Sequence, residues 1–197
     1  MRSGDVKLLE NHGLFEVAHV WRRYESLEDA WARSRDGDLM LRVALALGRD
    51  SGAYIATGAA VAALALDVWR ACYPRDPRLA GALRLAQETT DAKVLAPAVE
   101  AAKDAARQAR AEGLKPAVLV ARAVVAALVP EASEPNAAEL ASRAAYACVK
   151  YSSEHGADQF EGKAERARVA TLVAASGLVR EHFPMTAALA PPISLSA

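Results

Sequence analysis

The sequence predicts an all-α fold, a compact array or bundle of about eight helices. Ala occupies 47 of the 197 positions and Leu occupies 22, whereas aromatic residues make up only 6% of the chain. Ala has the highest helix propensity, because it loses no side-chain rotamer freedom when a helix forms. Apolar residues also recur at spacings of three and four, which is the period of one helix face. Strand-like alternation is not seen, nor are hairpin dipeptides between strand-like runs.

The first part of the chain is predicted to form four helices, over residues 5–24, 26–34, 39–48 and 51–73. Ser26 is the expected N-cap of the second helix, with Asp29 three residues on as a weak capping box. The acidic turn at residues 35–38 is expected to cap the third helix. The fourth helix is apolar nearly all round, so we expect residues 53–72 to be largely buried at the centre of the fold.

The second part of the chain is predicted to form helices over residues 76–90, 97–112, 115–129, 134–154 and 157–183. Pro97 is expected to kink or restart a helix that Asp91 caps. The charged face of residues 97–112 predicts a surface helix, and in the next helix Lys115 and Arg122 share one face. These helices are expected to form a single domain over residues 1–184. Residues 185–197 are uncharged and Pro-containing, which predicts an extended or disordered tail.

The net charge, the cysteines and the hydropathy of the chain exclude some classes of function. The 24 basic side chains balance the 24 acidic ones, so the chain lacks the basic excess of a general nucleic-acid binder. Cys72 and Cys148 lie on separate predicted helices and are expected to be buried free thiols of a cytoplasmic protein. The apolar runs 53–66 and 117–129 are too short or too charged for a membrane span. We therefore expect neither nucleic-acid nor membrane binding.

Catalytic motifs such as a phosphate-binding glycine loop or a nucleophile elbow are not found. His12, Glu16 and His19 would lie near one face of an unbroken helix, where they could bind a metal. Matching ligands on a second helix are missing, and a solvated or half-buried face explains the three residues equally well. We therefore expect no metal, no cofactor and no catalytic residue, although a site assembled in space from distant residues is left open.

Two charged segments are candidate interaction surfaces. The turn Arg35, Asp36, Gly37 and Asp38 has three interpretations: helix caps, contacts with a partner, or a calcium site that lacks most of its ligands. The second segment is an acidic stripe at Asp158, Glu161 and Glu165, which is either a solvated face or a surface for a basic partner.

Several segments resemble a predicted family of all-helical immunity proteins encoded beside bacterial polymorphic toxins. The resemblance spans most of residues 28–184 and is carried by Ala30-Trp31, residues 36–41 (DGDLML), 72–78 (CYPRDPR) with Ala82-Leu83, 144–147 (AAYA) and 178–184 (LVREHFP). It implies a non-enzymatic protein that neutralises a cognate toxin by blocking its active cleft. Such binding needs aromatic anchors and complementary charge. We expect the partner-binding residues to be Tyr24, Trp31, Arg35, Asp36 and Asp38.

The alternative function is a helical structural or assembly module, acting through self-association or by docking to a larger complex. Small residues such as those at 58–63 allow helices of two chains to approach closely, so a homo-oligomer is possible. A third class, an enzyme with a site built across helices, is less favoured. Of the aromatic residues, Trp69 is expected in the core, whereas Trp31 and Tyr24 are expected to reach the surface.

Overall fold

The computed structural model describes residues 1–47, 51–129, 135–151 and 157–183. These residues form eleven α-helices and no strand, and 82% of them are helical. The predicted all-α class is therefore confirmed, with more helices than the expected eight. The helices are α1 Ser3–Asn11, α2 Phe15–Trp21, α3 Leu27–Arg33, α4 Gly37–Leu47, α5 Ser51–Ala63, α6 Leu66–Cys72, α7 Arg78–Glu88, α8 Ala92–Ala111, α9 Lys115–Leu128, α10 Ala137–Tyr151 and α11 Ala157–His182.

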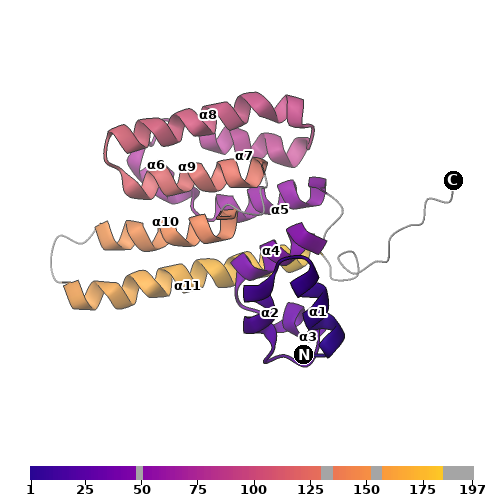
Figure 1. The fold of residues 1–197 in the computed structure, drawn as a ribbon. Helices are drawn as coiled ribbons and strands as arrows, with labels where there is room; N and C mark the ends of the chain where they lie inside the picture. The colour runs from indigo at the N-terminus through magenta and orange to yellow at the C-terminus, as the bar shows by residue number, and fades with distance from the viewer. Residues whose placement is uncertain (48–50, 130–134, 152–156, 184–197) are drawn as a thin grey trace.

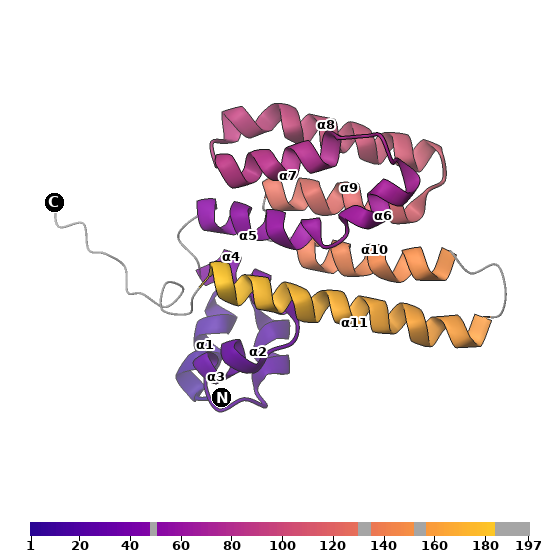
Figure 2. The same ribbon diagram turned by 180° about the vertical axis from the view of Figure 1, so that it is seen from behind.

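The helices stack in layers (Figure 1). At one side of the molecule α7 packs along α8, followed by α9 with α5 and α6, then by α10 and finally by the long α11. The short helices α1, α2 and α3 form a separate group beyond α4 and α11, at the end of α11 that carries the C-terminus (Figure 2). Because the loops described between neighbouring helices are short, α7 and α8, and α8 and α9, run antiparallel.

The centre of the fold is the contact between α5 and α9. Gly58 of α5 lies so close to Ala127 of α9 that a Cβ atom added at Gly58 would be 3.1 Å from the Ala127 Cα. Val61 and Ala65 are buried, as expected, and Val68 is half-buried. The approach is possible because Gly58 and Ala127 are both small, so the two helix backbones can come close together.

The predicted helix over 51–73 is in fact two helices. The chain breaks at Leu64 and Ala65, where α5 ends and α6 starts at an angle of 50° to it. Among the residues that the structure describes, no single helix is both long and apolar enough to cross a membrane, although this bent pair meets the length and composition required when its two halves are taken together.

The predicted helix over 5–24 is also divided, and Gly13 is the reason. Its φ angle is +74°, a left-handed conformation that ends α1 and that side chains other than Gly rarely adopt. The chain then turns, and α2 begins at Phe15. The unbroken helical face that we expected for His12, Glu16 and His19 is therefore not formed.

The acidic turn and the Ser26 cap have the structural roles predicted for them. Ser26 Oγ accepts a hydrogen bond from the Asp29 N–H at 3.1 Å, and Asp36 Oδ1 accepts from the N–H groups of Asp38 and Leu39. Gly37 begins α4 directly against the α11 backbone. Arg180 of α11 then donates a 2.8 Å hydrogen bond to the Ser34 carbonyl, which fixes the end of α3 to α11.

Three further expectations differ from the structure or lie outside it. Pro97 does not restart a helix, because α8 runs through it from Ala92 to Ala111. Cys72 and Cys148 form no disulfide in the described part of the chain, and both are only half-buried. Burial, and to a smaller extent the nearby Cys148, raises the pKa of the Cys72 thiol. The predicted tail 185–197 lies outside the described residues.

Candidate anion-binding site

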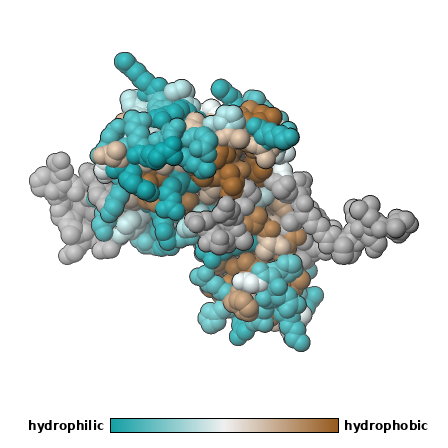
Figure 3. Space-filling view, turned by 45° about the horizontal axis from the view of Figure 1, so that its top comes forward, coloured by the Kyte–Doolittle hydropathy of each residue, from teal (hydrophilic) through white to brown (hydrophobic). Residues whose placement is uncertain are grey.

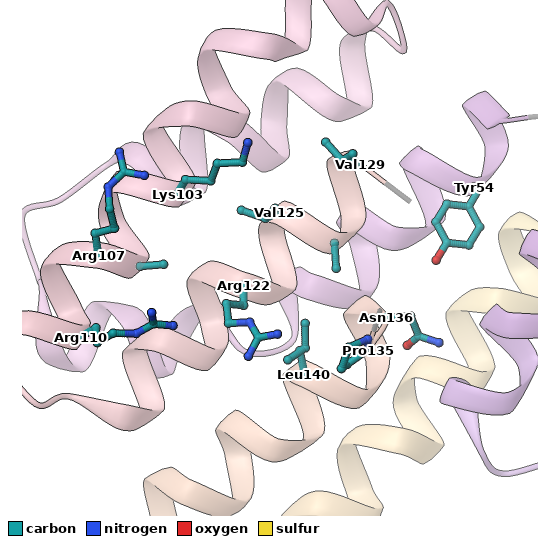
Figure 4. A pocket seen from close by; sticks show the side chains of 12 residues that line it. Tyr54, Lys103, Arg107, Arg110, Arg122, Val125, Val129, Pro135, Asn136 and Leu140 are labelled. Atoms are coloured by element: carbon teal, nitrogen blue, oxygen red, sulfur yellow. The ribbon is translucent and has the colours of Figure 1, made fainter. Parts of the chain in front are cut away.

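A cavity of about 410 Å³ lies between the outward faces of α8 and α9, with α10 and α5 completing its wall. Its volume falls within the range typical of small-molecule sites. Figure 4 shows the side chains that line it, which come from these helices and from the residues just before α10. In the space-filling view, apolar side chains are exposed in the middle of the molecule and are bordered by hydrophilic residues (Figure 3).

Four cations line the cavity, and none of its described lining residues is acidic. Lys103, Arg107 and Arg110 follow one another on α8 at spacings of four and three, so they share one helix face. Arg122 of α9 lies opposite this face (Figure 4). Positive charge is therefore concentrated locally in a chain whose net charge is zero.

The cations of α8 differ in how far their charge is neutralised. Lys103 Nζ is 2.8 Å from Glu100 Oε1, and Arg107 forms an ion pair with Asp104. The hydrogen bond from Lys103 lowers the pKa of Glu100, which keeps that carboxylate ionised. Arg110 forms no ion pair or hydrogen bond with any residue in the described part of the chain. Its guanidinium is therefore the α8 charge that is available to a ligand.

Tyr54 stands at the opposite end of the cavity from Arg107 and Arg110 (Figure 4). Only 3% of the residue is exposed, and its hydroxyl makes no hydrogen bond with a described residue. Burial, and then the charge of Asp38, raise the pKa of Tyr54 to about 12. The hydroxyl is therefore protonated at physiological pH and can donate a hydrogen bond to a ligand.

Asn136 lies beside Tyr54, but all the donors and acceptors of its side-chain amide already form hydrogen bonds. Its Nδ2 donates to the carbonyl oxygen of Asp38 at 3.1 Å and to Asp38 Oδ1 at 2.7 Å. Its Oδ1 accepts from the N–H groups of Ala138 and Glu139 at 3.0 and 3.2 Å, which caps α10. An amide offers two donors and two acceptor lone pairs, and all four are used.

Apolar side chains form the stretch between the two ends, from Val125 and Val129 of α9, Leu140 of α10 and Ala106 of α8. Val129 is 40% exposed, so this lining is partly open to solvent. The cavity can therefore hold an anion at its cationic end and an apolar body along its wall. Lys103 and the arginines offer hydrogen-bond donors to an anion at one end, and the protonated Tyr54 hydroxyl offers one at the other.

The structure corrects one expectation about the predicted partner-binding residues. Trp31 does not reach the surface: it is 3% exposed and packs edge-to-face on Trp21, with ring centroids 6.5 Å apart. Tyr24 is half-buried, with the Arg23 and Arg33 guanidinium groups 5.1 and 5.9 Å from its ring centroid. Trp31 therefore does not provide an exposed aromatic anchor.

Most of the charged residues of the predicted surface already form hydrogen bonds within the protein. Asp36 caps α4, whereas Arg35 is exposed. Asp38 accepts from Asn136 and from Arg42 Nε at 3.1 Å, and burial raises the pKa of its carboxyl group. The hydrogen bond from Asn136 to Asp38 therefore joins the turn to the start of α10. The turn does not lie beside an exposed Trp31, because Trp31 is buried. Whether these residues contact a partner stays a prediction.

The side chains at 158 and 161 of the acidic stripe lie outside what is described. Glu165 is exposed and pairs with Arg168 at 3.0 Å, which is what a solvated helix face would show.

We expect the purified protein to contain no stoichiometric transition metal. The break at Gly13 separates His12 from Glu16 and His19, and the described residues contain no group of three potential ligands. Elemental analysis of untagged protein checks this expectation. Stoichiometric zinc, iron or manganese that is lost in His12→Ala would contradict it.

The cavity was not predicted from the sequence, but part of its pattern was visible there. The basic residues at 103, 107 and 110 share a face of the helix whose polar side we had assigned to the surface. Arg122 is the single charge within an otherwise apolar stretch of α9. What the sequence did not reveal is that these two faces meet, or that Tyr54 reaches them from α5.

The fold and the cavity together define an all-α protein with a candidate anion-binding site. The chain matches no protein-family model, and neither a curated protein nor a solved structure is significantly similar to it.

Proposed function

We propose that this protein is a non-enzymatic binding domain that holds an anionic ligand in the cavity between α8, α9, α10 and α5. The observation that carries the proposal is the convergence of Lys103, Arg107, Arg110 and Arg122 on an apolar cavity whose described lining contains no carboxylate. Clefts of this volume, lined by apolar side chains with a few convergent polar groups, are typical ligand sites.

Electrostatics favours an anion over a neutral ligand. Lys103 and Arg107 each pair with a carboxylate of α8, so the attraction at this end of α8 comes mainly from Arg110, which is exposed and has no ion pair in the described part of the chain. Exposed charges of one sign around a concave, poorly polarisable wall attract and orient ligands of the opposite sign. The apolar wall adds binding free energy that does not depend on salt, because burial of apolar surface is not screened by ions.

The test uses anilinonaphthalene sulfonate, an amphiphilic anion whose fluorescence rises in apolar surroundings. We expect saturable binding at one site, with affinity falling about three- to tenfold in Arg110→Ala, because that change removes an exposed charge that contacts the ligand. Raising the salt concentration should weaken binding in the native protein more than in this variant.

Arg84→Ala is the matched control, since Arg84 is an exposed arginine on α7 that does not line the cavity. Its affinity for the dye should equal that of the native protein. Circular dichroism and thermal melts establish that both variants fold. Equal loss in the two variants, or a dye signal without saturation, would contradict the proposal.

The immunity function suggested by the resemblance remains a prediction, and the cavity gives it a more specific form. A toxin captured here would present an acidic segment to Lys103 and Arg110, not a basic one to Asp36 and Asp38. A cognate toxin that binds the native protein and Arg84→Ala but not Arg110→Ala would support that form. The alternative, self-association through Ala-rich faces, predicts concentration-dependent sedimentation that Arg110→Ala leaves unchanged.

A further inference from the structure

The two ends of the cavity have different chemistry, and their separation sets the length of the ligand. Arg107 and Arg110 lie at one end and Tyr54 at the other, with Val125 between them (Figure 4). The α9 residues that line the cavity run from Arg122 to Val129. Seven residues of α-helix rise about 10 Å. A ligand that contacts both ends therefore spans roughly this distance.

The cationic end is suited to a phosphate group. Three of its four cations are arginines, whose planar guanidinium groups bind phosphate oxygens in pairs. A phosphomonoester carries about −1.5 to −2 charges and three acceptor oxygens near neutral pH. A carboxylate has one charge and two oxygens, so it offers fewer acceptors to these guanidinium groups.

The other end is suited to a hydrogen-bond acceptor. The Tyr54 hydroxyl has no described partner, and a ligand that filled this end of the cavity would cover it, while the adjacent Asn136 amide is fully used by Asp38 and the start of α10. Buried polar groups in folded proteins are nearly always hydrogen-bonded. A ligand whose far end is purely apolar would leave this hydroxyl unsatisfied.

We propose that the cavity binds a small phosphomonoester whose apolar body carries a hydrogen-bond acceptor at the end far from the phosphate. The phosphate lies between Arg110 and Arg122, the body lies along Val125 and Val129, and the acceptor faces the Tyr54 hydroxyl. This inference rests on the proposed function, because it names the ligand class of the same cavity.

The test compares two probes of nearly equal shape, para-acetylphenyl phosphate and para-isopropylphenyl phosphate, by isothermal titration calorimetry. Only the acetyl group has an acceptor. Tyr54→Phe should weaken binding of the acetyl probe about three- to tenfold, the range of one neutral hydrogen bond, and leave the isopropyl probe unchanged. Tyr54→Phe removes only a hydroxyl without a described partner, so the variant should fold normally.

The phosphate end is tested by Arg110→Ala, with Arg84→Ala as control. We expect Arg110→Ala to weaken both probes to a similar degree, which separates the role of Arg110 from that of Tyr54. Inorganic phosphate should bind at least about tenfold more weakly than either probe, because it lacks the apolar body. Para-acetylbenzoate should also bind more weakly than para-acetylphenyl phosphate.

The failures of the two proposals can be told apart. Equal binding of the benzoate and the phosphate ester, or an equal effect of Tyr54→Phe on both probes, would overturn the assigned ligand class while leaving anion binding intact. Binding of an acidic peptide such as hexaglutamate, with no detectable binding of either phosphate ester, would likewise overturn it in favour of a protein segment. If neither the esters nor anilinonaphthalene sulfonate bound, the proposed function would fail as well.

Discussion

Gly37→Ala should destabilise the protein by about 3 kcal/mol, as expected for a severe case of overpacking in a closely packed interior. A Cβ atom at this position would lie 2.8 Å from the Ser176 nitrogen, 2.9 Å from the Leu172 carbonyl oxygen and 2.5 Å from the Ala175 Cβ. Two of these three atoms belong to the α11 backbone, which cannot rotate away as a flexible side chain could. Either α4 or α11 must shift.

A thermal melt measures the effect. For a protein of this length, 1 kcal/mol corresponds to about 2–4 °C, so we expect Tm to fall by roughly 6–12 °C. Gly81→Ala is the matched control: Gly81 lies inside α7, and nothing is within 4 Å of its added Cβ. Ala is the better helix former by about 0.5–1 kcal/mol, so this variant should melt at the same temperature or higher. A stable Gly37→Ala variant would show that α4 does not pack on α11 as described.

Asn136→Ala should have the second-largest effect, a loss of about 2–4 kcal/mol, because one side chain both caps α10 and holds Asp38. Loss of an N-cap costs about 0.5–2 kcal/mol, and loss of a hydrogen bond to a charged group costs about 1.5–3 kcal/mol. The two contributions share a residue and need not add fully. We expect Tm to fall by roughly 4–16 °C.

Asn136→Asp separates the two contributions. Asp is as good an N-cap as Asn, but its carboxylate would lie beside the Asp38 carboxylate, which is already half-buried. Two adjacent carboxylates raise the pKa of the pair above its unfolded value, so the folded state binds more protons than the unfolded state. The deficit of this variant relative to the native protein should therefore be small at about pH 4.5 and grow as the pH rises. A deficit that is independent of pH would contradict the hydrogen bond between Asn136 and Asp38.

Local sequence signals predicted much of the fold because they act over a few residues. Ser26 and Asp36 cap the helices that follow them, as their positions suggested. The burial of α5 and the separate helix from Lys115 also follow from hydropathy and from the Gly-Leu-Lys-Pro connection. These signals are local, since an N-cap contacts a backbone group two or three residues away.

The helix breaks were harder to predict. At Leu64 and Ala65 the break has no Gly or Pro, so periodicity alone favoured one long helix. At residue 13 a Gly was present, but the same residue also occurs inside helices, and only its positive φ angle decides between the two cases. Trp31 was misplaced for a related reason: its nearness in sequence to a charged turn said nothing about Trp21, which packs against it from another helix.

The candidate site was not predicted because it depends on which helix faces meet. Its residues come from four helices, and Tyr54 and Arg110 are separated by more than fifty positions in the sequence. Each residue has an ordinary explanation on its own helix, as a buried aromatic side chain or a solvated cation. Only the packing of α8 on α9 makes them one cavity.

The close contact between Gly58 and Ala127 has a consequence for how this sequence can change over generations. Where neighbouring helices already touch through Gly and Ala, almost every substitution enlarges the side chain, and overpacking a tight interior is penalised. Substitutions at positions of this kind should therefore rarely be tolerated. Variation should accumulate instead on the outward faces of the helices, including those at the mouth of the cavity, while the scaffold beneath them stays the same.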